Sequence, residues 1–122
     1  MISIEGGIKL NEIILRKRKP NIINVEYCCE ITEYLNDNVR YNFGDVHPYS
    51  FCYIYDSRSF CNNIVVIRMP GSTIGCIRFN DENVITECCI YDDVMLKIDC
   101  FSEDINERLK RFVGRTLKFQ EE

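Results

Sequence analysis

Residues 64–91 read IVVIRMPGSTIGCIRFNDENVITECCIY, and this stretch decides the fold prediction. Apolar and β-branched residues dominate it, and turn-forming residues interrupt it at Pro70-Gly71 and at residues 80–83. Such runs are typical of β-strands, and short turns join antiparallel neighbours because a parallel pair needs a crossover of about a dozen residues. The predicted strands of this β-meander are residues 64–69, 73–79 and 84–91.

A fourth strand is predicted at residues 94–101, after a turn at Asp92-Asp93. Apolar side chains alternate there with a mixed set, which is the period of a β-strand. The apolar face consists of Val94, Leu96, Ile98 and Cys100.

Residues 102–113 predict an amphipathic C-terminal helix. Ser102 is a suitable N-cap because its hydroxyl can accept a hydrogen bond from a backbone N–H of the first turn, and Gly114 is placed to end the helix. One apolar stripe runs along the predicted helix and consists of Ile105, Leu109, Phe112 and Val113.

The first half of the chain supports two interpretations. Residues 23–31 alternate as a strand would, yet the same segment carries a helical apolar stripe. The stripe consists of Ile23, Tyr27, Ile31, Tyr34 and Leu35. We predict a helix near residues 25–36, a strand at residues 2–15 broken near Gly6-Gly7, and a further strand at residues 49–55.

These elements predict an α+β fold, in which an antiparallel β-meander sheet carries the C-terminal helix and the helix near residues 25–36 on one face. The chain has 122 residues, so residues 1–122 are predicted to form a single domain. Its composition, 46% hydrophobic and 28% charged, excludes a disordered chain. No apolar run approaches the ~18 residues of a membrane span and no secretory signal is recognised, so we expect a cytoplasmic protein without a membrane partner.

The chain contains an unusual number of cysteines: Cys28, Cys29, Cys52, Cys61, Cys76, Cys88, Cys89 and Cys100. A cytoplasmic protein keeps its thiols reduced, so we interpret them as small buried apolar residues rather than as a disulfide framework. The vicinal pairs Cys28-Cys29 and Cys88-Cys89 would point to opposite faces of a strand, which does not suit a zinc site. No metal site and no cofactor are predicted.

Catalysis would depend on His47, the single histidine, acting as a base for one of the thiols. No local motif selects one thiol as the nucleophile. The glycines also lack the lysine and the following helix of a phosphate-binding loop. We therefore predict no catalytic residue and no enzyme activity, and a Cys/His enzyme is the least favoured alternative.

Charge is unevenly distributed along the chain, whose formal net charge is −4. Residues 1–20 carry five Lys and Arg against two Asp and Glu, residues 21–107 carry five against fifteen, and residues 108–122 carry five against two. The acidic residues of the central segment can serve solubility alone. Alternatively, they can attract a basic partner and make the encounter fast and specific. The predicted partner-binding residues are Asp81, Glu82, Glu87, Asp92 and Asp93.

A nucleic-acid interface is an alternative, because exposed aromatic rings beside cations can stack bases. Tyr49, Phe51, Tyr53 and Tyr55 share one face of a predicted strand. The net negative charge repels nucleic acid, which makes this the weaker hypothesis. Its predicted residues are Arg16, Lys17, Arg18, Lys19, Tyr53 and Tyr55.

We expect a small acidic binding or inhibitor protein that neutralises a basic macromolecular partner. An acidic α+β domain without a catalytic or cofactor motif is of the kind found among bacterial toxin-immunity proteins, whose partners are often basic nucleases. This analogy rests on the architecture alone, and no sequence motif supports it. A viral antagonist of a host factor is an alternative with the same physical requirements.

Overall fold

The computed structural model describes residues 11–18, 25–38, 52–69, 72–91 and 105–120. The strands in these residues are β1 (Glu12–Lys17), β2 (Glu26–Cys28), β3 (Tyr53–Tyr55), β4 (Ile64–Met69), β5 (Ser72–Phe79), β6 (Ile85–Ile90) and β7 (Thr116–Phe119). The helices are α2 (Glu30–Asn38) and α4 (Ile105–Leu109), and a 3-10 turn, η1 (Lys110–Phe112), continues α4.

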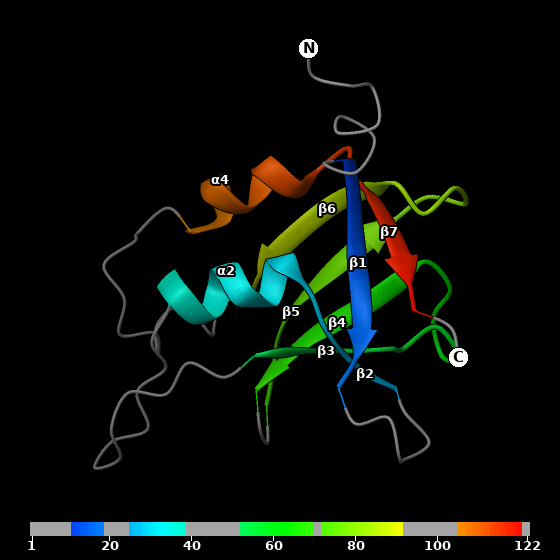
Figure 1. The fold of residues 1–122 in the computed structure, drawn as a ribbon, viewed down its shortest axis with the longest axis horizontal. Helices are drawn as coiled ribbons and strands as arrows, with labels where there is room; N and C mark the ends of the chain where they lie inside the picture. Colours follow the sequence, from blue (N-terminus) through cyan, green and yellow to red (C-terminus); the bar gives the residue numbers. More distant parts are fainter. Residues whose placement is uncertain (1–10, 19–24, 39–51, 70–71, 92–104, 121–122) are drawn as a thin grey trace.

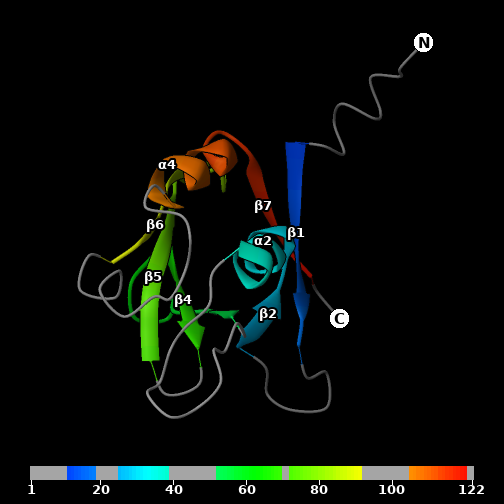
Figure 2. The same ribbon diagram turned by 90° about the vertical axis from the view of Figure 1, so that its left-hand side faces the viewer.

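The described strands form one mixed sheet with the order β6-β5-β4-β3-β2-β1-β7 (Figure 1). Neighbours are antiparallel except for β1 and β7, which run parallel. The sheet curls, and α2 and α4 lie within the curl (Figure 2). An α+β fold built on a sheet is confirmed, whereas the prediction of a purely antiparallel sheet is wrong at β7.

The predicted meander of residues 64–91 is present as β4, β5 and β6. Buried and partly exposed residues alternate along β4, as expected for a strand that has one face on the core. In the turn between β5 and β6, the side-chain oxygen of Asn80 accepts hydrogen bonds from the N–H groups of Glu82 and Val84, at 2.8 and 3.0 Å. Asn83 takes a positive φ of 65°, which asparagine tolerates better than most residues. The predicted strand at residues 94–101 lies outside the described residues.

The ambiguous segment near residues 25–36 contains both a strand and a helix. Residues 26–28 form β2, which pairs with β1 and β3, so the predicted helix is wrong there. The helix follows as α2, where the Thr32 hydroxyl accepts a hydrogen bond from the Cys29 N–H at 2.9 Å. The Cys29 N–H precedes the helix and has no partner within it. The side chain of Thr32, in the first turn, supplies the missing acceptor.

Two other predicted strands are described only in part. β1 extends beyond the predicted end at Leu15 and takes up Arg16 and Lys17 of the basic run. β3 covers the last three residues of the strand predicted at residues 49–55. The remainders, at residues 2–10 and 49–51, lie outside the described residues.

β7 is the element that the sequence pattern does not predict. It pairs with β1 in parallel, from Glu12 with Thr116 to Leu15 with Phe119. On its other side, Thr116 forms an antiparallel bridge with Val84, the residue before β6. β7 therefore contacts both β1 and the strand at the opposite edge of the sheet, so the sheet edges meet at one end.

The C-terminal helix ends earlier than predicted. α4 ends at Leu109 and η1 ends at Phe112, and the predicted beginning at residues 102–104 lies outside the described residues. Ile105, Leu109 and Phe112 are buried, but Val113 is 42% exposed and has extended backbone angles, so it does not continue the predicted stripe. Gly114 follows with a φ of 93°, a conformation that glycine adopts at low cost and that ends the helix as predicted.

Candidate functional site

Two connections meet at one end of the sheet, on the right of Figure 1. One is the loop of residues 56–63 between β3 and β4, and the other is the turn of residues 80–83 between β5 and β6. The Asn63 side-chain amide donates a hydrogen bond to the Asp81 carboxylate at 2.8 Å and joins the two. We call residues 56–63 and 80–83 together the loop–turn surface.

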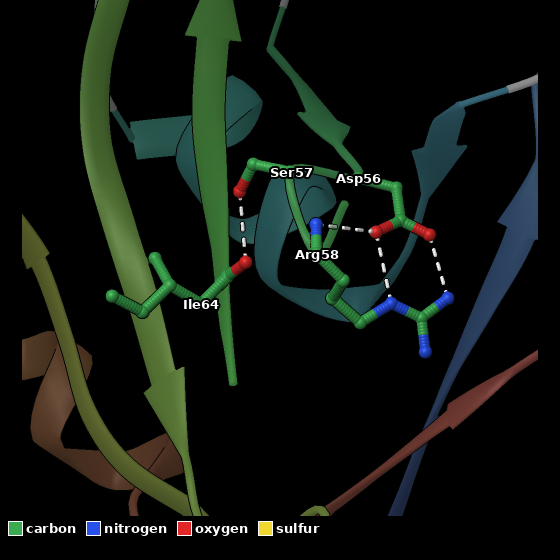
Figure 3. Close-up of polar contacts among 4 residues, drawn as sticks. All are labelled: Asp56, Ser57, Arg58 and Ile64. Atoms are coloured by element: carbon green, nitrogen blue, oxygen red, sulfur yellow. Dashed lines mark hydrogen bonds and ion pairs between the residues drawn. The ribbon is translucent and has the colours of Figure 1, made fainter. Parts of the chain in front are cut away.

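Phe60 is the most exposed large apolar side chain in the described part of the chain, with 83% of its surface open to solvent. The loop that carries it is nevertheless held by several hydrogen bonds. The N–H groups of Phe60 and Cys61 both donate to the Ser57 carbonyl at 2.9 Å, and the Ser57 hydroxyl donates to the Ile64 carbonyl at 2.8 Å (Figure 3). The backbone therefore holds an aromatic side chain in water at a defined place.

An ion pair supports the base of this loop. The Arg58 guanidinium donates to both carboxylate oxygens of Asp56, at 2.8 and 2.6 Å, and the Arg58 N–H donates to the same carboxylate (Figure 3). The guanidinium also lies 3.6 Å from the centre of the Phe119 ring. Burial raises the pKa of Asp56, but the hydrogen bonds and charge of Arg58 outweigh it, so the net shift is downward. The loop is thereby anchored to β7.

The predicted acidic residues occupy different environments. Asp81 and Glu82 are exposed in the turn, and within the described residues neither forms an ion pair. Glu87 lies on β6 and pairs with Arg78 at 3.0 Å, so a cation already compensates its charge. Asp92 and Asp93 lie outside the described residues. The structure thus places two of the predicted residues, Asp81 and Glu82, on the loop–turn surface.

Within the described residues, the alternative nucleic-acid residues do not form an open stacking platform. Tyr53 is 8% exposed, and the Arg18 guanidinium covers its ring at 4.6 Å from the ring centre. Arg18 is also paired with Glu26 at 2.7 Å. Arg16 and Lys17 belong to β1, Tyr55 is half-buried, and Lys19 lies outside the described residues.

The described thiols are free, and several are poor nucleophiles. Burial raises the pKa of Cys29 to about 11 and that of Cys52 to about 12, and it also raises the pKa of Cys88. Such thiols stay protonated at neutral pH, whereas the thiolate is the reactive form. Cys61 differs from the predicted buried thiols because it is exposed, beside Phe60. His47 lies outside the described residues.

A separate cavity of about 590 Å³ lies between β6 and α4. Beside it, the Asn106 side-chain amide bonds both the N–H and the carbonyl of Ile90, at 2.8 and 3.1 Å, and so ties α4 to the edge of β6. The cavity is lined by Thr86, Glu87, Cys88, Cys89, Asn106, Lys110 and Val113.

Neither a metal centre nor a membrane span is apparent in the described ranges. No group of three or more His, Cys, Asp or Glu side chains is arranged there to hold a metal ion. The helices of those ranges also lack the length and apolarity that crossing a bilayer requires. Comparison of the chain with protein-family models, with curated proteins and with solved structures found no match.

Sequence reasoning missed Phe60 and Asn63, the residues that define the loop–turn surface. The available signal was a phenylalanine within the polar stretch DSRSFCNN of residues 56–63, between two predicted strands. An aromatic residue in a polar connection either folds back onto the core or stays in water. Sequence periodicity does not distinguish these outcomes, whereas the exposure of Phe60 in the tertiary structure does.

Proposed function

We propose that the chain is a binding protein that docks on a basic macromolecular partner through the loop–turn surface. The observation that supports this most is the exposure of Phe60 on a hydrogen-bonded loop whose Asn63 is joined to Asp81. Phe60 serves as the apolar anchor, and the Asp81 and Glu82 carboxylates form an acidic rim beside it.

The energetics of interfaces favour this arrangement. Aromatic side chains are enriched at the centres of interfaces, where a few residues supply most of the binding free energy. A rigid loop loses little conformational entropy when its anchor is buried, so more of that free energy appears as affinity. Phe60 satisfies both conditions, because its ring is exposed while the backbone of residues 57–61 is hydrogen-bonded.

Charge supports a basic rather than an acidic partner. The chain has a formal net charge of −4, and the turn contributes two carboxylates that form no ion pair among the described residues. Opposite charge steers the encounter and rejects partners of like charge. In this proposal the protein acts in the cytoplasm as an inhibitor that covers a basic surface, as an immunity protein covers a nuclease-type toxin. A viral antagonist would cover a basic host factor by the same chemistry.

Site-specific photo-crosslinking in the cells that make the protein tests the proposal. A benzophenone amino acid replaces Phe60 in one variant and, in a matched variant, Tyr91, which is 37% exposed and follows the end of β6 that lies away from the turn. We expect a discrete adduct with a basic protein from position 60, and its loss when Asp81→Lys and Glu82→Lys are added. Identical adducts from both positions, or an adduct from position 60 that survives the charge reversals, would contradict it.

Affinity measurements on the captured partner then separate the two contributions. Phe60→Ala should weaken binding at least ~10-fold, mainly through faster dissociation. Asp81→Lys with Glu82→Lys should slow association and reduce its dependence on salt. Glu107→Lys, an exposed charge reversal on α4, is the matched control and should leave the association rate nearly unchanged.

A further inference from the structure

Cys76 and Cys89 lie directly opposite each other on neighbouring strands. They are register partners in the antiparallel pair of β5 and β6, and their sulfur atoms are 4.0 Å apart. Directly opposed residues of an antiparallel pair have Cα atoms about 4.5–5.5 Å apart, which lies within the range that a disulfide spans. The backbone is therefore already placed for a bond between these two sulfurs.

The two thiols lie on the face of the sheet that points away from the helices. Cys88 belongs to the hydrophobic core, so Cys89, the next residue of the strand, points to the opposite face. Cys76 is 4% exposed, whereas Cys89 is half-buried. A reagent of small-molecule size can thus reach Cys89 first, with Cys76 behind it.

We propose that Cys76 and Cys89 form a dithiol site that low-molecular-weight disulfides oxidise to an intramolecular disulfide. The Cys89 thiol loses its proton and attacks one sulfur of the disulfide, whose S–S bond breaks and releases one thiolate. The Cys76 thiol then loses its proton and attacks the Cys89 sulfur, which displaces the second thiolate. The two released thiolates take up the two protons, so two protein thiols are oxidised and one external disulfide is reduced to two thiols.

The surroundings of the pair set the rate of this exchange. Burial and the neighbouring Cys76 raise the pKa of Cys89 to about 11, so only a small fraction is thiolate at neutral pH. Exchange is therefore slow near pH 7 and accelerates as the pH rises, because the thiolate is the attacking species. A dithiol whose thiolate form is not stabilised also favours the disulfide once it has formed.

Peptide mapping after treatment with oxidised glutathione tests the proposal. The folded protein carries Cys61→Ser, which removes the exposed thiol, and is treated at pH 8.5, alkylated and digested with trypsin. Cys76 then lies in the peptide of residues 69–78, and Cys88 and Cys89 share the peptide of residues 79–97. We expect these two peptides to be joined by a disulfide, and the thermal midpoint of the oxidised protein to rise and to return on reduction.

Neighbouring cysteines provide matched controls for the assignment. The linked peptides should persist in Cys88→Ala and disappear in Cys89→Ser. Fragmentation of the linked wild-type peptides gives the same assignment without any core substitution. Unlinked and alkylated Cys76, a link that survives Cys89→Ser, or a glutathione adduct on Cys89 that does not close would overturn the proposal.

Discussion

Thr116 and Val84 form the bridge through which the last strand of the sheet contacts the residue before β6. Backbone hydrogen bonds on both sides support this bridge, from the Ile85 N–H to the Arg115 carbonyl and from the Leu117 N–H to the Asn83 carbonyl, both at 2.8 Å. The bridge covers an edge that would otherwise be open to other chains. It also holds the turn of residues 80–83, and with it Asp81 and Glu82, against β7.

Gly75 should tolerate substitution less well than Gly114. A methyl group on Gly75 would overlap the Cys89 carbonyl oxygen on the paired strand, so Gly75→Ala must push β5 and β6 apart. We expect a loss of about 3 kcal/mol in the free energy of unfolding. Gly114→Ala meets no atom but keeps a φ of 93°, so it should cost about 1–2 kcal/mol. Urea unfolding measures both, and equal losses would contradict the close approach at Gly75.

Arg115 should contribute more to stability than an exposed ion pair does. Its guanidinium donates to both Glu30 carboxylate oxygens, at 2.8 and 2.9 Å, and to the Glu12 carbonyl, and so joins α2 to β1. The Arg115 side chain is 18% exposed, and we expect Arg115→Met to lower the free energy of unfolding by about 1.5 kcal/mol. Lys110→Ala removes the exposed pair with Glu107 and should cost about 0.3 kcal/mol. Urea unfolding at low and high salt measures the loss in the free energy of unfolding for both variants. Equal losses would contradict the larger contribution of Arg115.

Phe60 and Phe112 should differ strongly in their effects on stability. Phe112 is 1% exposed within the core, so Phe112→Ala should cost about 3–5 kcal/mol. Phe60 is 83% exposed, and Phe60→Ala should change the free energy of unfolding by no more than about 0.5 kcal/mol. Thermal and urea unfolding provide the measurement. A large loss for Phe60→Ala would show that its ring packs on the protein and does not serve as an exposed anchor.

Asp56 should make stability depend on pH in the acid range. Its pKa in the folded state lies below the ordinary 3.8, so the charged carboxylate favours the folded state. This contribution is complete above the ordinary pKa and is lost as the pH falls through the lower folded-state pKa. Wild type should exceed Asp56→Asn by about 1 kcal/mol at pH 7, and the difference should shrink below about pH 4.

Urea unfolding of both proteins between pH 7 and pH 2.5 measures this difference. Glu107→Gln is the control, because its ion pair is exposed and should contribute little at any pH. A difference between wild type and Asp56→Asn that stays constant over the whole range would refute the role assigned to the carboxylate.

The surface proposed for binding could be predicted only in part. Turn chemistry identified Asp81 and Glu82, because an Asn-Asp-Glu-Asn sequence between two apolar runs leaves its carboxylates in water. Phe60 and Asn63 escaped prediction, since their roles depend on the hydrogen bond from Asn63 to Asp81, 18 residues away in the sequence. A contact of this kind is decided by the pairing of β4 with β5.

Local sequence determined the β4–β5–β6 meander, the asparagine turn and the glycine that ends the C-terminal helix. In each of these, the deciding contacts join residues close in the chain, so alternation, turn residues and backbone freedom are sufficient. Tertiary structure alone decided that residues 26–28 form a strand while residues 30–38 form a helix, and that residues 116–119 form a strand. The first outcome depends on hydrogen-bonding partners in β1 and β3, and the second on pairing with Glu12 and Val84. A four-residue strand has too little pattern of its own, so its conformation follows from neighbours distant in the sequence.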